Sequence, residues 1–367
     1  MSRTVCGMAR RYTRGYRAHR GRRRGSTVLK VIIVLLLILL VAGILFIVFL
    51  GRYVEYTDSG VRVNLPWLQE GEPEGPAATD PVVIITEDPV QSPTHGQAVR
   101  TLDEIGVVEV TAQQLADGSA AQAVAAAGGN ALVVEMKGID GRLAWVSQTG
   151  QAAALGVNAQ DNSVAQAVSA LAQEDGLHLV ARISCFRDQA LASAGVGGPL
   201  MTQGGNIWYD ASGYRWVSPV SQQVRDYLAQ LCVELAGMGF DEILLESVGF
   251  PDLGETHVLA TSENRPEDLT GPVAQFLEEL SGALADTDAA LSVLASQETV
   301  LGTDELTGMT PELLAEYAHR VWTDLPEQGI AVLTSSLERA GMDQAEQRIV
   351  SLGGSREEGS WTTLTAG

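Results

Sequence analysis

The sequence predicts an α/β protein of the (β/α)8 barrel class, preceded by a single transmembrane helix. From about residue 104, short β-branched runs alternate with alanine-rich helical stretches, a pattern typical of parallel strands joined by helical crossovers. Seven or eight such units fall within about 260 residues, the usual size of this barrel. An open doubly wound sheet is the alternative, but residues 110–114, at the turn after the first expected strand, lack the glycine-rich pattern that such sheets usually carry.

The first 50 residues predict a membrane anchor. Residues 31–50 contain neither a charge nor a proline, and as a helix they would span about 30 Å, the hydrocarbon thickness of a bilayer. No small-residue cleavage site follows, which favours retention over removal as a signal peptide. Residues 1–30 carry ten Lys and Arg and no acid. By the positive-inside rule this tail stays in the cytoplasm and the C-terminal domain is extracellular; binding of RNA or anionic lipid is the alternative interpretation.

Beyond the tail the chain is strongly acidic. Only 14 of the 24 Lys and Arg lie after residue 30, against 45 Asp and Glu, so residues 31–367 carry a formal charge of −31. Such a domain repels nucleic acid, which we therefore exclude as a partner. Residues 51–103 are rich in Pro, Glu, Gly and Thr and predict an extracellular stalk, with a short strand or docking segment at 82–86. The barrel domain is expected at 104–367.

The expected barrel elements follow the change of period along the chain. Strands are predicted at 106–112, 130–137, 177–186, 241–247, 290–297, 319–325, 347–352 and 360–364. Helices are predicted near 113–127, 162–175, 220–239, 271–286 and 311–318. The last units are compressed, which predicts a lean or incomplete C-terminal part of the barrel.

Ionisable side chains stand at or just beyond the carboxyl ends of the second to sixth expected strands, where barrel active sites lie. They are Glu135, Lys137, Arg182, Asp188, Glu246, Glu298 and Asp324. By alternation, Glu135 and Lys137 share one face of their strand. Because an ionised side chain in an apolar strand is costly unless it is paired or hydrated, these residues predict one shared polar pocket. A structural ion-pair network is the alternative.

The long loop expected at 187–219 contains several aromatic residues. Trp208 and Trp216 can stack on sugar rings through their apolar faces, or they can cap the barrel as ordinary packing. Trp145, after the second strand, presents the same choice.

Several chemistries lack their motifs. The five histidines have no metal-ligand spacing, and no HExxH, CxxC or G-x-S-x-G sequence occurs, so no metal or other cofactor is predicted. Paired carboxylates remain, and they suit glycoside hydrolysis. Cys185 and Cys232 are interpreted as buried free thiols, with a disulfide between them as the alternative.

Four blocks carry a family resemblance. NALVVEMKGIDGRLAWVS (130–147), GLHLVARISCFRD (176–188), IWYDASGYRWVSP (207–219) and GFDEILLESVGFP (239–251) occur in the order and spacing of a bacterial family of putative glycoside hydrolase domains. The sequence resembles this family over roughly residues 104–330. The resemblance implies a (β/α)8 barrel on the surface of a Gram-positive cell.

The resemblance can be carried over by position. It implies site roles for Glu135, Lys137, Arg182, Asp188, Trp208 and Trp216. The chain departs from the family at the fourth strand, where Glu246, Ser247 and Gly249 replace an aspartate, a tyrosine and an arginine. A carboxylate displaced by about 1 Å can cost a catalyst on the order of 100-fold, and losing the arginine removes a bidentate cation.

The sequence thus predicts a membrane-anchored glycoside hydrolase-like barrel acting on an envelope or extracellular polysaccharide. Glu246 is expected as one catalytic carboxylate, with Glu298 or Glu135 as the other. Lys137, Arg182, Asp188, Trp208 and Trp216 are expected to bind the substrate. The alternatives are a degenerate barrel that binds a glycan or a protein without turnover, and a purely structural envelope protein.

Overall fold

The computed structural model describes residues 54–57, 60–63, 102–174, 176–326, 329–354 and 359–365. The predicted tail, the predicted span 31–50 and most of the predicted stalk lie outside these residues. The chain divides into two compact units, Met1–Pro89 and Val90–Gly367. In the first unit, β1 (Val54–Thr57) and β2 (Gly60–Val63) pair as an antiparallel hairpin. No helix in the described part of the chain is both long and apolar enough to cross a membrane.

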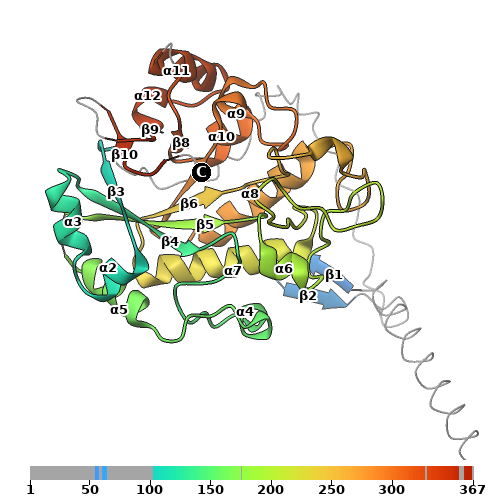
Figure 1. Ribbon diagram of the computed structural model, residues 1–367, viewed down its shortest axis with the longest axis horizontal. Coiled ribbons are helices and arrows are strands. Elements are labelled where there is room, and N and C mark those ends of the chain that lie inside the picture. Colours follow the sequence, from blue (N-terminus) through green and yellow to red (C-terminus); the bar gives the residue numbers. More distant parts are fainter. Residues whose placement is uncertain are drawn as a thin grey trace, which may run out of the picture. The chain divides into compact units, whose positions relative to one another are not determined.

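The second unit is built on a closed barrel of eight parallel strands, in the order β10-β3-β4-β5-β6-β7-β8-β9 (Figure 1). The strands are β3 (Gly106–Val110), β4 (Ala131–Lys137), β5 (His178–Ser184), β6 (Glu242–Glu246), β7 (Ala290–Leu294), β8 (Val321–Thr323), β9 (Ile349–Ser351) and β10 (Trp361–Thr362). Each falls within one of the eight predicted strand ranges. The predicted (β/α)8 barrel is therefore confirmed, and the open sheet is excluded.

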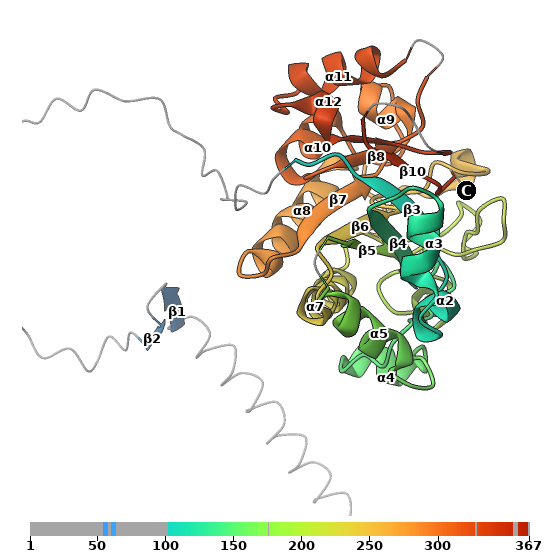
Figure 2. The same cartoon turned by 90° about the vertical axis from the view of Figure 1, so that its left-hand side faces the viewer.

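Helices surround the strands (Figure 2). They are α2 (Ala112–Ala116), α3 (Ala120–Ala126), α4 (Gly150–Leu155), α5 (Ser163–Leu171), α6 (Gln189–Ser193), α7 (Gln222–Met238), α8 (Thr270–Leu284), α9 (Gln297–Leu301), α10 (Pro311–Tyr317), α11 (Ile330–Arg339) and α12 (Ala345–Arg348), with a 3-10 turn η1 (Thr256–Val258). The single helix expected at 113–127 is two helices, because the chain turns at Gly118 with a φ of +79°.

The barrel strands are short in the C-terminal part of the chain, where the expected strands and helices follow one another most closely. Strands β8 and β9 have three residues each and β10 has two. Closure still occurs, because Trp361 of β10 pairs in parallel with Gly106 of β3. A Cβ at Gly106 would lie 2.6 Å from the Trp361 ring, so the absence of a side chain there lets the last strand approach the first.

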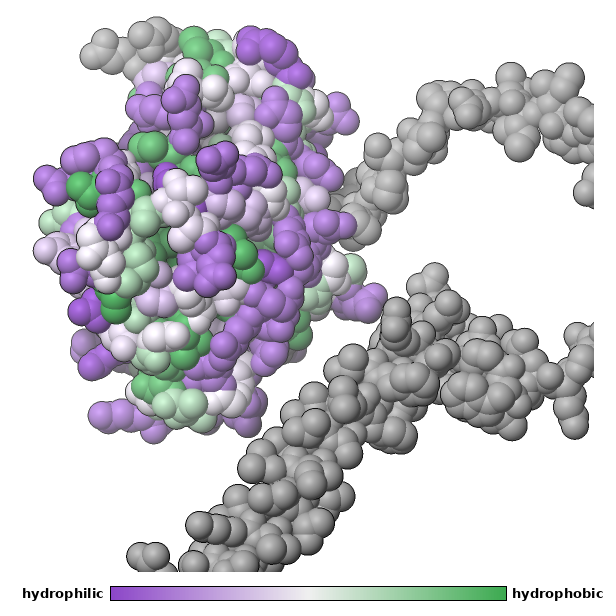
Figure 3. Space-filling view, turned by 90° about the vertical axis from the view of Figure 1, so that its right-hand side faces the viewer, coloured by the Kyte–Doolittle hydropathy of each residue, from purple (hydrophilic) through white to green (hydrophobic). Residues whose placement is uncertain are grey.

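Two apolar layers hold the barrel together, as the alternation of side chains along each strand requires. The larger layer lies between the strands and the helices. The smaller fills the interior and consists of Ile105, Val107, Ala131, Val133, Val180, Leu244, Trp322, Val350 and Leu364, with Leu294 and Leu352 packed against it. Figure 3 shows one face of the unit, where hydrophilic residues outnumber scattered hydrophobic ones.

The two described cysteines, Cys185 and Cys232, are free and fully buried. Burial raises the pKa of the Cys185 thiol to about 12. The interpretation as buried free thiols is confirmed. Neither side chain has the low pKa and exposure that make a thiol reactive.

Candidate active site at the barrel mouth

Arg182 of β5 lies at the centre of a group of charges at the carboxyl end of the barrel. One terminal guanidinium nitrogen contacts both Glu109 of β3 and Glu135 of β4, each at 3.2 Å, and the other contacts Glu246 of β6, also at 3.2 Å. Arg182 and Glu135 are direct register partners. These residues follow the interior side chains of their strands at the two-residue period, so all four belong to the interior face of the barrel.

This cluster is open to solvent. The side chains of Glu135 and Glu109 are 52% and 42% exposed, although both belong to strands whose other residues are mostly buried. Glu246 and Arg182 are less accessible, at 22% and 16%. The carboxylate oxygens of the cluster therefore lie where a ligand can reach them.

The environment of Glu135 favours its protonated form. Desolvation raises the pKa of its carboxyl above the usual range, the Arg182 charge opposes that shift, and Glu246 adds to it by repulsion. Three carboxylates around one cation leave an excess negative charge, which a proton on one of them relieves. A carboxyl group with a raised pKa beside a second carboxyl group is the pairing that glycoside hydrolysis needs.

A cavity of about 410 Å³ adjoins the cluster and shares Glu246 with it. Its lining comes from the carboxyl ends of β6, β7 and β8 and includes Glu298 and Asp324, both predicted from the sequence, together with Asp252. Glu246 and Glu298 therefore line the same cavity, and Glu246 and Glu135 contact the same arginine. Either of the two predicted catalytic pairs is compatible with these positions.

The chain takes an unusual path directly after Glu246. Ser247 has a positive φ of 55°, a conformation that non-glycine residues rarely adopt, and it lines the cavity. At Gly249, with φ of +115°, a Cβ would lie 2.3 Å from the Thr307 carbonyl oxygen. The Phe250 amide donates to that same oxygen. The family arginine therefore cannot stand at this position without moving the segment around Thr307.

Lys137 and Asp188 do not face the mouth. Their side chains are 0% and 1% exposed and form an ion pair of 2.8 Å, and the Lys137 ammonium also donates to the Ser184 carbonyl. The expectation that Lys137 shares a face with Glu135 is wrong, because the register shifts between them and Lys137 pairs with Ile183, an outer-layer residue. Asp188 accepts from the Leu191 amide as the N-cap of α6.

The two loop tryptophans are also buried. Trp208 is 2% exposed and donates to the Glu255 carbonyl, while Trp216 is 3% exposed and donates to Asp210. Trp216 borders the cavity, but neither ring offers a free face of the kind that stacks on a sugar. Arg187 contacts Asp210 at 2.6 Å. Although burial alone would raise the pKa of Asp210, the hydrogen bonds from Trp216 and Arg187 hold it below the usual range.

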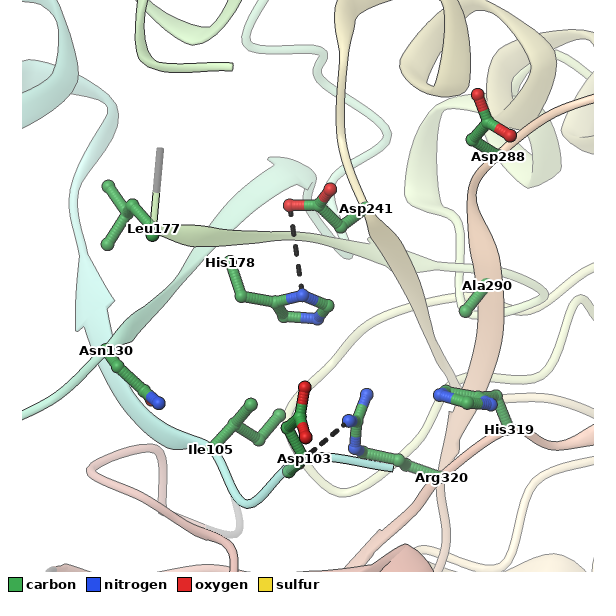
Figure 4. A pocket seen from close by; sticks show the side chains of 11 residues that line it. Asp103, Ile105, Asn130, Leu177, His178, Asp241, Asp288, Ala290, His319 and Arg320 are labelled. Carbon is green, nitrogen blue, oxygen red and sulfur yellow. Dashed lines mark hydrogen bonds and ion pairs between the residues drawn. The ribbon is translucent and has the colours of Figure 1, made fainter. Parts of the chain in front are cut away.

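A second cavity, of about 460 Å³, lies at the opposite, amino-terminal end of the strands (Figure 4). His178 and Arg320 line it, and beneath them is the fully buried carboxylate of Glu242. Glu242 accepts from His178 at 3.0 Å, from Arg320 at 2.6 Å and from the Trp322 indole at 3.0 Å. Residues at this end of a (β/α)8 barrel serve stability rather than catalysis.

Sequence reasoning missed some charged residues of the mouth. Glu109 lies two residues after Val107 in the same strand, so the alternation that located Glu135 was also available for it. Asp252, Arg187 and Asp210 lie in loops, where no period relates them to a strand end. Within the described residues, no group of three or more His, Cys, Asp or Glu is arranged to hold a metal ion.

A (β/α)8 barrel with several carboxylates in an open mouth has the architecture and the acids of a glycoside hydrolase. Residues 108–312, more than half of the chain, match the family described as "putative glycosyl hydrolase domain". The chain belongs to this family. No curated protein matches it.

Several solved structures are similar to the chain. A hypothetical protein from Ruminiclostridium thermocellum ATCC 27405 is 21% identical, with 50% of this chain and 96% of that one covered and a TM-score of 0.44. The PgaB (BpsB) glycoside hydrolase domain from Bordetella bronchiseptica is 14% identical, with coverage of 68% and 84% and a TM-score of 0.45. The glycoside hydrolase domain of a PelA variant from Pseudomonas aeruginosa is 16% identical, with coverage of 67% and 83% and a TM-score of 0.40.

Proposed function

We propose that the protein is a glycoside hydrolase that cleaves a polysaccharide with a pair of carboxylates in the barrel mouth. Membership of the family supports an enzyme of this class. The observation that carries the mechanism is the placement of Glu135 and Glu246 on opposite terminal nitrogens of Arg182. Because both oxygens contact one guanidinium, they lie at most about 9 Å apart, a bound compatible with either hydrolytic geometry.

The two carboxylates differ in the way that the mechanism requires. Glu135 has a raised pKa and is the general acid that protonates the leaving oxygen. Glu246 is the less exposed partner and contacts Arg182 at 3.2 Å, and its proposed role is to attack the anomeric carbon or to activate a water. Arg182 holds both in register and offsets their repulsion. Glu298, in the same cavity as Glu246, is the alternative partner.

The protein is further proposed to act at the cell surface, held by residues 31–50 with the basic tail in the cytoplasm. The length and apolarity of that segment and the ten cations before it support this placement. An envelope or other extracellular polysaccharide is then the substrate within reach.

Replacement of Glu246 tests the proposal. Full-length protein in detergent micelles is incubated with a panel of polysaccharides, and the release of reducing ends is measured. Glu246→Gln is expected to reduce hydrolysis by at least about 1,000-fold while glycan binding is kept, and Glu263→Gln, an exposed acid in the loop before α8, should have no effect. Binding without cleavage by the unaltered protein would favour the degenerate, glycan-binding alternative, and equal activity of Glu246→Gln would refute the mechanism.

A further inference from the structure

The barrel mouth carries a large excess of negative charge around a cavity. Six carboxylates lie in the Arg182 cluster and the adjoining cavity: Glu109, Glu135, Glu246, Asp252, Glu298 and Asp324. Two cations stand among them, Arg182 and Arg187. Arg187 is neutralised by Asp210, which it contacts at 2.6 Å, and its guanidinium lies 5.4 Å from the centre of the Tyr214 ring.

Most of these acids exceed what hydrolysis requires. Catalysis uses two carboxylates and Arg182 offsets about one charge, so the remaining carboxylates are left with a negative charge that a cationic ligand can compensate. Asp252 and Asp324 are exposed at the rim of the cavity and have no ion pair within the described residues. Partial desolvation and repulsion from Asp304 and Glu298 raise the pKa of Asp252, while the Arg187 charge opposes that shift.

The ligand that meets this arrangement is a sugar that carries positive charge. We propose that the substrate is a glycan containing amino sugars with free amino groups, whose ammonium groups lie against Asp252 and Asp324 while the cleaved bond lies at Glu246. This inference rests on the proposed function, and it names the substrate class of the same site. A neutral sugar would leave the rim carboxylates uncompensated, and an anionic one would be repelled.

The cavity is compatible with such a residue. Its volume of about 410 Å³ is within the range of small-ligand sites, and the exposed, apolar Leu253 borders it beside the acids. An amino sugar presents both a ring face and a charge, and it can therefore use both parts of this lining. The rim carboxylates Asp252 and Asp324 set selectivity, and the carboxylates at Arg182 set turnover.

Binding of two matched oligosaccharides tests the substrate class. Fully N-acetylated and fully de-N-acetylated β-1,4-glucosamine hexamers are titrated calorimetrically into full-length protein in detergent micelles at pH 5.5. The de-N-acetylated hexamer should bind at least about tenfold more tightly in 50 mM salt, and this preference should shrink in 500 mM salt. Asp252→Asn with Asp324→Asn should lower its affinity about tenfold and leave the N-acetylated hexamer unaffected.

A control variant carries a larger charge change at the other end of the barrel. Glu174, Glu338 and Glu346 are exposed acids in or just after helices that precede barrel strands, far from the mouth, and their triple replacement by Gln should not alter selectivity. Tighter binding of the N-acetylated hexamer, binding of neither, or equal losses in the mouth and control variants would overturn the substrate class. Reducing-end release separates the two proposals. Selective binding of the de-N-acetylated hexamer without cleavage would refute only the proposed hydrolase activity. Cleavage of the N-acetylated hexamer alone would refute only the proposed preference for a charged substrate.

Discussion

The Glu242 carboxylate and the Arg320 guanidinium lie 2.6 Å apart inside the barrel, with side-chain exposures of 0% and 2%. Arg320 also donates to the Asp103 carbonyl, which ties the amino-terminal end of the barrel to the segment before β3. The pair therefore fastens β6 and β8 to each other and to the start of the domain.

Loss of the Glu242 charge should destabilise the domain. Glu242→Gln keeps the shape but leaves the buried Arg320 charge without an ionic partner, at a cost of about 3–5 kcal/mol. Urea unfolding followed by tryptophan fluorescence measures the change in free energy of unfolding. Glu263→Gln, an exposed acid, is the control and should change it by less than about 0.5 kcal/mol. A similar small effect for both variants would contradict the structural role.

The same pair predicts a pH dependence. Burial alone would raise the pKa of the Glu242 carboxyl. Hydrogen bonding from His178 and the Arg320 charge outweigh burial and hold this pKa far below the ordinary value of 4.5. A depressed carboxyl pKa contributes stability that is fully present above the unfolded value and is lost as the pH falls below it. Urea midpoints should therefore decline below about pH 4.5. This decline should be shallower in Glu242→Gln, and identical slopes would refute the assignment.

The fold was predictable to a greater depth than the site. Every barrel strand lies within a predicted range, because parallel strands buried on both sides have an apolar signature that survives even in three-residue β8. Lys137 was misplaced because alternation assumes a constant register, and the irregularity after Glu135 depends on pairing with β5. In the sequence, Trp208 and Trp216 cannot be told from tryptophans that stack on sugar rings. Only the packing of their loop shows that they are buried.

The sealed Lys137–Asp188 pair should behave as a structural element. Lys137→Met removes the ionic partner of the buried Asp188, and we expect a loss of about 3–5 kcal/mol in the free energy of unfolding. Adding Asp188→Asn should recover part of that loss, because the uncompensated charge is then gone and the N-cap oxygen is kept. Urea unfolding of the two single variants and the double variant measures the coupling. Additive losses would show that the two side chains do not interact.

Glu135 should set the alkaline limb of the pH–rate profile. In the proposed mechanism its protonated carboxyl donates to the leaving oxygen, so turnover falls as the pH rises through its elevated pKa. Glu135→Gln should slow polysaccharide cleavage by about 100- to 10,000-fold and remove that limb. Aryl glycosides with acidic leaving groups need little protonation and should be much less affected. Initial rates with both substrate types between pH 4 and 9 measure the contrast, and Glu298→Gln is examined in parallel. The contrary outcome is that Glu298→Gln removes the alkaline limb and spares the aryl glycosides, while Glu135→Gln does neither. In that case Glu298 is the general acid, and the contact of Glu135 with Arg182 is structural.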